Sequence, residues 1–275
     1  MQPGLASIRA GQFAGDRVIY GHSQQTLPSS WPELDALVVS LGPFYACAWC
    51  ALERSARVSA PVSADPTVLK QLLAFLESAG VLMEPGVRSD RARRSLYDPI
   101  SWDYRDRWQA RDDLERVLSH VLGAWRSSLD GEARLWLWRQ LADREACAYL
   151  TSLLSRHRIG ARHAEEILAQ QDDDWVHLSL GRKRYVLWSS VRGAASEFLS
   201  TGGDDQAAIR AMSEEMRNRV RWLTFRESAG QLRRTDFCFL PAPSWRRPLM
   251  VDVAMETILT IGANYWLAPP TLLSV

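Results

Sequence analysis

The sequence predicts a mainly α protein, in which a small helix–strand–turn–strand module precedes a bundle of about five or six helices. Two observations predict this class. Most long segments repeat apolar residues at intervals of three and four, as one face of a helix does, and strand-like segments are short and gather between residues 80 and 100. The 275 residues, of which 47% are hydrophobic and 24% charged, have the composition of a folded globular chain.

Changes in composition predict three parts, namely an N-terminal arm (1–29), a first domain (30–102) and a helical domain (103–275). The arm is rich in Gly, Ser and Gln. The first domain begins with Ser30, which fits a capping box with Glu33 at the start of a helix. Gly42 and Pro43 should interrupt that helix, because an internal proline lacks a backbone donor and crowds the preceding turn. A second apolar helix is expected over residues 44–57.

The helix–strand–turn–strand module that follows is predicted from residues that typically start and stop helices and strands. Asp65 can cap a helix over residues 66–79, in which apolar residues form one stripe, and Gly80 stands where that helix should stop. Short apolar segments then indicate a first strand over residues 81–83 and a returning strand over 95–97, with a turn at 84–86 after the first strand.

Residues 43–97 resemble a winged helix-turn-helix domain, with the loop 58–65 where such domains have a middle helix. The resemblance implies that helix 66–79 would enter the major groove and that residues 84–94 would form a wing contacting the DNA backbone. Between residues 86 and 94, four arginines (Arg88, Arg91, Arg93, Arg94) accompany a single acidic residue, so this wing could bind phosphates. Winged helices also serve as protein–protein adaptors, which stays open here.

The helical domain is expected to contain several amphipathic segments. They begin with a helical stretch from about residue 103 that includes an apolar stripe over 114–129, and continue with 132–156, 161–170, 182–200, 206–223 and 248–262. A turn is expected at the acidic residues 172–174. A loop is expected over 233–247, with a short strand at 237–240.

A second basic stretch covers residues 210–247, with nine arginines and four acidic residues. Arg217, Arg221, Arg233 and Arg234 are its candidate phosphate contacts, and the rings of Trp222, Phe225 and Trp245 are interleaved with them. Basic side chains beside stacking rings are typical of grooves for single-stranded nucleic acid or RNA. The alternative is a solvated helix face, on which arginines pair with glutamates three or four residues away.

These patterns predict a non-catalytic protein that binds DNA or RNA, or a subunit of a nucleoprotein assembly that also contacts other protein subunits. The net charge is only +1, so the attraction for phosphates must come from local clusters. No cofactor is expected. A protein–protein adaptor that docks its partner through exposed Trp side chains is an alternative function.

A catalytic role is the less expected alternative. Arg158 and His163 have a spacing similar to that of the HEPN ribonucleases, which are all-helical; this resemblance would imply RNA cleavage by that pair. No metal is expected, because Cys47 and Cys50 form a lone CxxC and a structural zinc needs two further ligands. Both cysteines are expected to be small core residues of an apolar helix.

The sequence predicts a cytoplasmic protein with no membrane contact. Its four cysteines are too few for a disulfide scaffold, and residues 1–20 lack the order of charged and apolar segments of a signal peptide. No apolar run of membrane-spanning length is expected.

Overall fold

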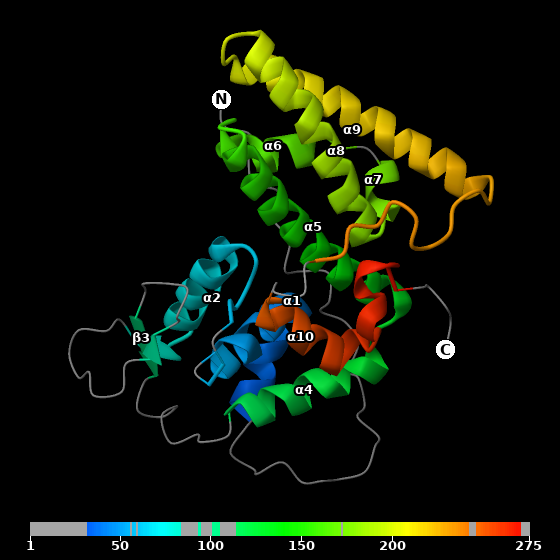
Figure 1. Ribbon diagram of the computed structural model, residues 1–275. Coiled ribbons are helices and arrows are strands. Elements are labelled where there is room, and N and C mark those ends of the chain that lie inside the picture. Colours follow the sequence, from blue (N-terminus) through cyan, green and yellow to red (C-terminus); the bar gives the residue numbers. More distant parts are fainter. Residues whose placement is uncertain are drawn as a thin grey trace.

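The computed structural model describes residues 32–55, 57–58, 60–83, 93–94, 101–104, 114–171, 173–241 and 246–270. It confirms a mainly α protein built as a helical bundle (Figure 1). The α-helices are α1 (Pro32–Ser55), α2 (Pro66–Ser78), α4 (Leu114–Ser128), α5 (Gly131–Arg156), α6 (Ala164–Ala169), α7 (Asp173–His177), α8 (Leu180–Ser200), α9 (Asp205–Ser228) and α10 (Leu249–Ala254). Shorter turns are η1 (Ala161–His163), η2 (Met255–Leu259) and η3 (Gly262–Trp266), and the strands are β1 (Leu82–Met83), β2 (Arg93–Arg94) and β3 (Ser101–Tyr104).

Helix α1 is kinked where the sequence predicts an interruption. Gly42 has φ 71° and ψ 169°, outside the helical region, and Pro43 follows it. A positive φ is accessible to glycine at little cost, and the following proline cannot donate the backbone hydrogen bond that a straight helix needs. The kink divides α1 into two arms, and its second arm is the more completely buried.

Helix α2 begins at the expected cap. Asp65 Oδ1 accepts a hydrogen bond from the Thr67 amide at 2.8 Å, and its other carboxylate oxygen forms an ion pair with Arg144 of α5. The apolar stripe of α2 is buried against α1, while the loop before α2 is held by the far end of the chain. The amide of Leu249 donates to the Pro61 carbonyl at 2.8 Å, and the amide of Met250 donates to the Val62 carbonyl at 3.0 Å.

The small sheet differs from the expected hairpin. Its order is β1-β3-β2, with both pairings antiparallel, and Leu82 lies opposite Tyr104. The partner of β1 is therefore β3, and the expected returning strand at 95–97 lies outside the described residues. Residues 103 and 104, predicted to open a helical stretch, belong to β3, and the described helix starts only at Leu114. Strand pairing depends on partners distant in sequence, which the local pattern does not contain.

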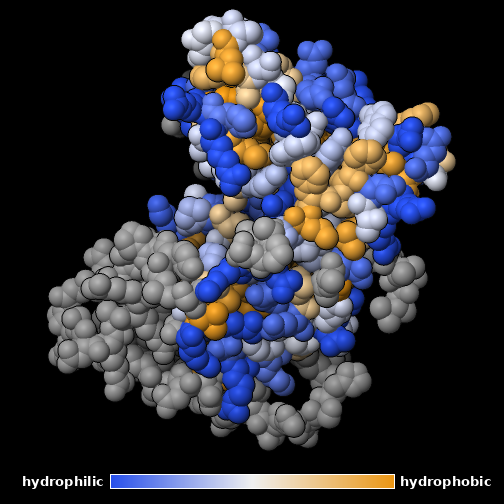
Figure 2. All heavy atoms as spheres, in the orientation of Figure 1, coloured by the Kyte–Doolittle hydropathy of each residue, from blue (hydrophilic) through white to orange (hydrophobic). Residues whose placement is uncertain are grey.

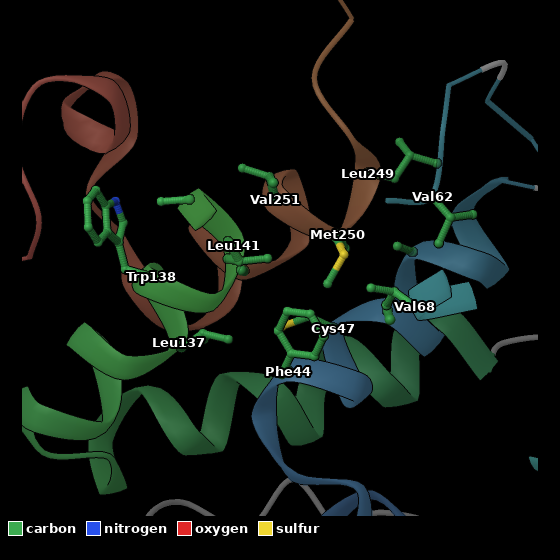
Figure 3. Close-up of a cluster of buried hydrophobic side chains, with 14 of the residues drawn as sticks. Phe44, Cys47, Val62, Val68, Leu137, Trp138, Leu141, Leu249, Met250 and Val251 are labelled. Atoms are coloured by element: carbon green, nitrogen blue, oxygen red, sulfur yellow. The ribbon is translucent and has the colours of Figure 1, made fainter. Parts of the chain in front are cut away.

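The main core lies where α1 packs against α4 and α10 (Figure 1). Figure 3 shows Phe44 and Cys47 of α1 meeting Leu137 and Leu141 of α5 beside Met250 of α10. All of these side chains are buried, within one continuous apolar cluster. The core therefore crosses the boundary predicted after residue 102, because α1 lies before that boundary and its main neighbours lie after it.

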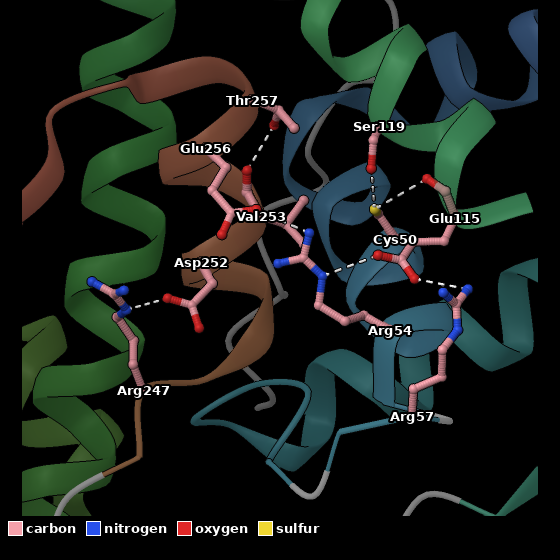
Figure 4. A network of polar contacts seen from close by, with 10 residues as sticks. All are labelled: Cys50, Arg54, Arg57, Glu115, Ser119, Arg247, Asp252, Val253, Glu256 and Thr257. Carbon is pink, nitrogen blue, oxygen red and sulfur yellow. Dashed lines mark hydrogen bonds and ion pairs between the residues drawn. The ribbon is translucent and has the colours of Figure 1, made fainter.

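Polar contacts join the same elements at the edge of this core (Figure 4). The guanidinium of Arg54 contacts Glu115 of α4 at 3.2 Å and Glu256 of η2 at 2.9 Å. Arg57 contacts the second oxygen of Glu115 at 3.0 Å, and Cys50 Sγ lies 3.3 Å from Ser119 Oγ. These contacts fix α1, α4 and η2 to one another, although the three elements are far apart in sequence.

Helices α5, α8 and α9 form a second layer, in which α5 packs on α8 and α8 packs along α9 (Figure 1). Two local expectations were wrong here and nearby: residues 173 and 174, predicted to lie in a turn, begin α7, and residues 237–240 form no strand. The helix expected over 248–262 is observed as α10 followed by the π-helical turn η2, and it ends at Thr260, whose φ is 50°.

Candidate nucleic-acid interface

Helices α8 and α9 form an antiparallel hairpin at one end of the molecule (Figure 1). The turn between them uses Gly202 and Gly203, with φ of 69° and 100°, and Asp204 then caps α9 by accepting from the Gln206 amide at 2.8 Å. The loop after α9 returns across the start of α8, where the Phe239 amide donates to the Gly181 carbonyl at 2.9 Å. The hairpin and the loop together build one surface.

Five aromatic rings form a continuous row on this surface, which we call the ring row: Trp188, Phe239, Tyr185, Phe237 and Trp222. Successive ring centroids are 5.0, 5.4, 5.0 and 5.0 Å apart. The rings meet tilted or edge-to-face, a favourable aromatic geometry. The row begins partly buried on α8 and becomes exposed at Trp222 and Phe237. Figure 2 shows hydrophobic side chains gathered over the loop after α9 and bordered by hydrophilic ones.

Arginine side chains lie on the rings. The guanidinium carbon of Arg192 is 4.7 Å from the centroid of Trp188, and that of Arg226 is 5.4 Å from the centroid of Trp222. Arg219 donates to the Tyr185 hydroxyl at 3.2 Å. A cation over a ring face is attracted by the ring quadrupole, so these contacts hold positive charge against the apolar surface.

The arginines predicted on α9 and in the loop are all exposed. Arg217 and Arg221 are one helical turn apart, and Phe225 continues their line one turn further, next to the line of Trp222 and Arg226. These five residues form the α9 face. Arg233 and Arg234 lie in the loop, a few residues before the Phe237 that packs on Trp222.

Most carboxylates near this surface have a partner. Glu215 pairs with Arg219 at 2.7 Å, and Glu227 pairs with the buried Arg182 at 2.6 Å. Asp236 accepts a hydrogen bond from the Arg233 amide at 2.8 Å. Glu214, exposed one turn before Arg217 on α9, forms no ion pair within the described residues. The guanidinium groups of Arg217, Arg221, Arg226, Arg233 and Arg234 form no ion pair there either, and they outnumber the carboxylates of Glu214 and Asp236, so positive charge is in excess on this surface.

Buried Arg182 fixes the loop that carries part of this charge. Its Nη2 donates to the Arg233 carbonyl at 3.1 Å and its Nε donates to the Asp236 carbonyl at 3.4 Å. The same guanidinium pairs with Glu227 at the end of α9. Since Arg182 is almost fully buried in α8, it acts as an anchor between the loop and both helices.

Of the first predicted arginine group, only the backbone of Arg93 and Arg94 is described. Arg93 and Arg94 lie in β2, beside β3 at the opposite end of the molecule from α9 (Figure 1), and their side chains lie outside the described part. Arg88 and Arg91 also lie outside the described residues. The described candidate interface therefore consists of the α9 face, the ring row and the loop.

The sequence did not point to Tyr185, Trp188, Phe237 and Phe239 as part of this interface. Tyr185 and Trp188 follow the apolar period of the predicted helix over 182–200, and the structure leaves them half-buried at the edge of the core. The available signal was the apolar run Phe237-Cys238-Phe239-Leu240 within a predicted loop. Such a run indicates that the loop packs against another apolar surface.

The structure gives Arg158 and His163 different surroundings. Arg158 is exposed with φ 61°, after the end of α5, while the ring of His163 contacts Arg162 at 3.3 Å and Glu166 at 3.4 Å. No hydrogen bond or ion pair joins Arg158 to His163 within the described residues.

Cys47 and Cys50 lie in the buried arm of α1 as free thiols, as expected of small core residues. Burial raises the pKa of Cys50 to about 11 and that of Cys47 well above its usual value. A metal-binding thiolate needs the opposite shift. In the part of the chain that the structure describes, no group of three or more His, Cys, Asp or Glu side chains is placed to hold a metal ion.

A second polar cluster is buried between α5, α8 and η3. Glu145 Oε1 accepts from the Tyr265 hydroxyl at 2.8 Å, and burial raises the pKa of Glu145 to about 7. The guanidinium of Arg184 stacks over Tyr149 at 4.2 Å and over Trp266 at 5.3 Å. This cluster fixes the segment after α10 to the second layer.

Lys183 extends this polar region on α8. Its ammonium contacts Asp143 at 2.5 Å and lies 5.2 Å from the centroid of the Trp175 ring. Burial lowers the pKa of Lys183, because the charged form loses its hydration. The pairing with Asp143 and the ring compensates part of that loss, so this side chain joins α5, α7 and α8.

One described helix is long and apolar enough to cross a membrane by length and composition, although none was expected. It is the segment Leu34–Ser55 of α1, with a mean hydropathy of 1.5, and half of its most apolar window is buried inside the protein. Core helices pass the same test, and α1 packs on α4 and α10 as a core helix does.

Searches with this chain against protein-family models, curated proteins and solved structures found no match.

Proposed function

We propose that this protein is a non-catalytic nucleic-acid-binding protein that contacts phosphates through the α9 face and the loop after it. The observation that supports this most is the set of exposed guanidinium groups without a described ion pair, at Arg217, Arg221, Arg233 and Arg234, which outnumber the nearby carboxylates that lack a cationic partner. Arginine binds phosphate oxygens through two donors at once, so a surface of this kind suits a polyphosphate chain.

The attraction must be local and dependent on salt. The whole chain has a net charge of +1, so it gives no long-range field that would draw in nucleic acid. Binding through four to six guanidinium groups would release a similar number of counterions, and affinity would fall steeply as salt concentration rises.

The test is a filter-binding series at low salt, with labelled mixed-sequence DNA and RNA. Arg217→Ala and Arg221→Ala should each weaken binding and make the plot of log affinity against log salt shallower by about 0.7 to 0.9. Arg126→Ala is the matched control, since Arg126 is an exposed helical arginine on α4, at the other end of the molecule (Figure 1). If the wild-type protein binds no DNA or RNA at low salt, the proposal is wrong.

A winged-helix-like module formed by α2 and the small sheet is a separate part of this proposal. The cap at Asp65, the buried stripe of α2 and the three short antiparallel strands after it support such a module. Its phosphate contacts would be Arg88, Arg91, Arg93 and Arg94. Because the sheet lies far from α9 (Figure 1), the effects of substitutions in the two regions should be independent.

A protein–protein adaptor is the second candidate, and exposed apolar side chains favour it. Phe225 is 67% exposed and Leu240 is 57% exposed, next to the ring row. A partner held by such side chains would remain bound at high salt, because burial of apolar area is not screened. Nucleic acid held by guanidinium groups would dissociate under the same conditions, which separates the two candidates.

A further inference from the structure

Resting on the proposed function, we infer that the ligand of this surface is a single-stranded polynucleotide whose bases stack on Trp222 and Phe237. The two rings are the exposed end of the ring row, each 37% exposed. Bases in a duplex are stacked on one another and cannot reach such rings, whereas bases of a single strand can turn outward onto them.

The geometry of the two rings suits this role. Their planes meet at 84° with centroids 5.0 Å apart, so the edge of one ring points at the face of the other. In this arrangement the two rings do not cover each other completely, and ring faces are left over for a base. Phe225, on the neighbouring line of the α9 face, adds a third exposed ring. Stacking on rings is tolerant of sequence because every base has a flat apolar face.

The backbone holds Phe237 in an unusual conformation. Its φ is 57°, in the left-handed region that side chains other than glycine, Asn and Asp seldom occupy. Hydrogen bonds fix the chain on both sides, since the Asp236 amide donates to the Arg233 carbonyl at 3.1 Å and the Phe239 amide donates to the Gly181 carbonyl at 2.9 Å. The fold thus maintains a strained residue whose ring is displayed at the surface, a feature typical of functional sites.

Charge favours a polynucleotide over an apolar protein partner. Arg226 lies on Trp222 itself, and Arg233 and Arg234 precede Phe237 by only a few residues. Each base that stacks brings a phosphate with it, and these guanidinium groups form no ion pair among the described residues. Burying this face against an apolar partner would instead leave several cations without a counter-charge, which is costly.

Direct binding of defined oligonucleotides to the full chain tests the inference. Fluorescence anisotropy at low salt would compare a labelled 20-nucleotide dT strand, a 20-nucleotide U strand and a 20-base-pair DNA duplex, with a labelled polyglutamate peptide as a fourth ligand. We expect both single strands to bind more tightly than the duplex and the peptide. The dT and U arms show whether DNA or RNA is preferred.

Substitutions that keep apolar volume but remove the ring identify stacking. Trp222→Leu and Phe237→Leu should each weaken single-strand binding by about 5- to 150-fold, which corresponds to about 1 to 3 kcal/mol per stacked base, and leave duplex binding unchanged. Trp222→Phe should retain most of the affinity because it retains a ring. Trp136→Leu is the matched control, since Trp136 is 43% exposed on α5 outside the ring row.

The outcomes separate the inference from the proposal on which it rests. If neither single strand nor the duplex binds, the proposed function itself fails. If the duplex binds as well as the single strands, or if both leucine variants bind like the wild type, nucleic-acid binding stands and the stacking inference is wrong. Tighter binding of polyglutamate than of either strand would assign this face to an acidic protein partner. Should one leucine variant fail to fold, the other still decides the result.

Discussion

Replacing Glu145 with glutamine should abolish a pH dependence of the protein's stability that arises in the second layer. Glu145 is buried in α5, 5% exposed, with one carboxylate oxygen bonded to the Tyr265 hydroxyl. Its other oxygen, Oε2, is buried without a hydrogen-bond partner among the described residues. A glutamine side chain has nearly the same shape, and its amide oxygen can accept the same hydrogen bond, but it cannot ionise.

The magnitude follows from the pKa of Glu145. Burial raises this pKa from an ordinary value of 4.5 to about 7, against smaller lowering effects of the Tyr265 hydrogen bond and of Arg184 and Arg247, while Asp252 raises it slightly. The folded state therefore keeps a proton that the unfolded chain releases near pH 4.5. Stability falls as the pH rises from about 4.5 to about 7, by about 3 kcal/mol at 1.4 kcal/mol per pH unit.

The assay is chemical denaturation of wild type and Glu145→Gln between pH 4.5 and 8.5. The variant should be more stable than the wild type by up to about 3 kcal/mol at pH 8, and the two should converge near pH 4.5. Glu132→Gln, in the exposed first turn of the same helix, is the control and should leave the pH profile of the wild type unchanged. Parallel profiles of wild type and Glu145→Gln would refute the reasoning.

Three further predictions concern α1 and α2. Gly42→Ala should cost about 1 to 2 kcal/mol in urea denaturation, because the φ of 71° strains an alanine although nothing lies within 4 Å of its methyl group; an unchanged midpoint would contradict this. Asp65→Asn should lose only the ion pair with Arg144, whereas Asp65→Ala should also lose the α2 cap and unfold at about 1 kcal/mol lower stability than the asparagine variant; equal stabilities would show that the cap contributes nothing. Cys47 and Cys50 should react with iodoacetamide at pH 8 more slowly than the two partly exposed cysteines, and mass spectrometry showing the reverse order would place them outside the core.

The sequence predicted the elements that depend on local chemistry. The kink at Gly42, the cap at Asp65 and the end of α2 before Gly80 follow from backbone preferences of glycine, proline and aspartate, which act within a few residues. The mainly α class and most helix boundaries follow from apolar periodicity for the same reason. The helix predicted over 132–156 is observed as Gly131–Arg156.

What the sequence could not give depends on contacts between distant residues. The strand β3 has no strong local pattern and is defined by its pairing with β1. Glu145 and Lys183 look like solvated charges in a helical pattern, and only the packing of α5, α8 and η3 shows that both are buried. The ring row likewise joins Tyr185 and Trp188 of α8 to two phenylalanines more than 45 residues later in the chain.

The same applies to the predicted site. The exposed arginines of α9 and its loop were recognisable from composition, and the structure places Arg217 and Arg221 one turn apart. Their relation to rings on another helix was not recognisable, because it depends on how α8 and α9 pack. The distance between β2, which carries Arg93 and Arg94, and α9 is also a property of the tertiary fold alone (Figure 1).

The packing of α10 against α1 determines when the core around α1 can be completed during folding. Arg54 and its ion-pair partner Glu256 are 202 residues apart, and α1 finds its last apolar neighbours only in that late segment. During synthesis α1 therefore emerges long before α10, which covers part of its apolar surface. Contacts of such long range slow folding and leave apolar surface open in the meantime. A nascent chain of this protein would accordingly keep part of the apolar surface of α1 uncovered until α10 and η2 have been synthesised.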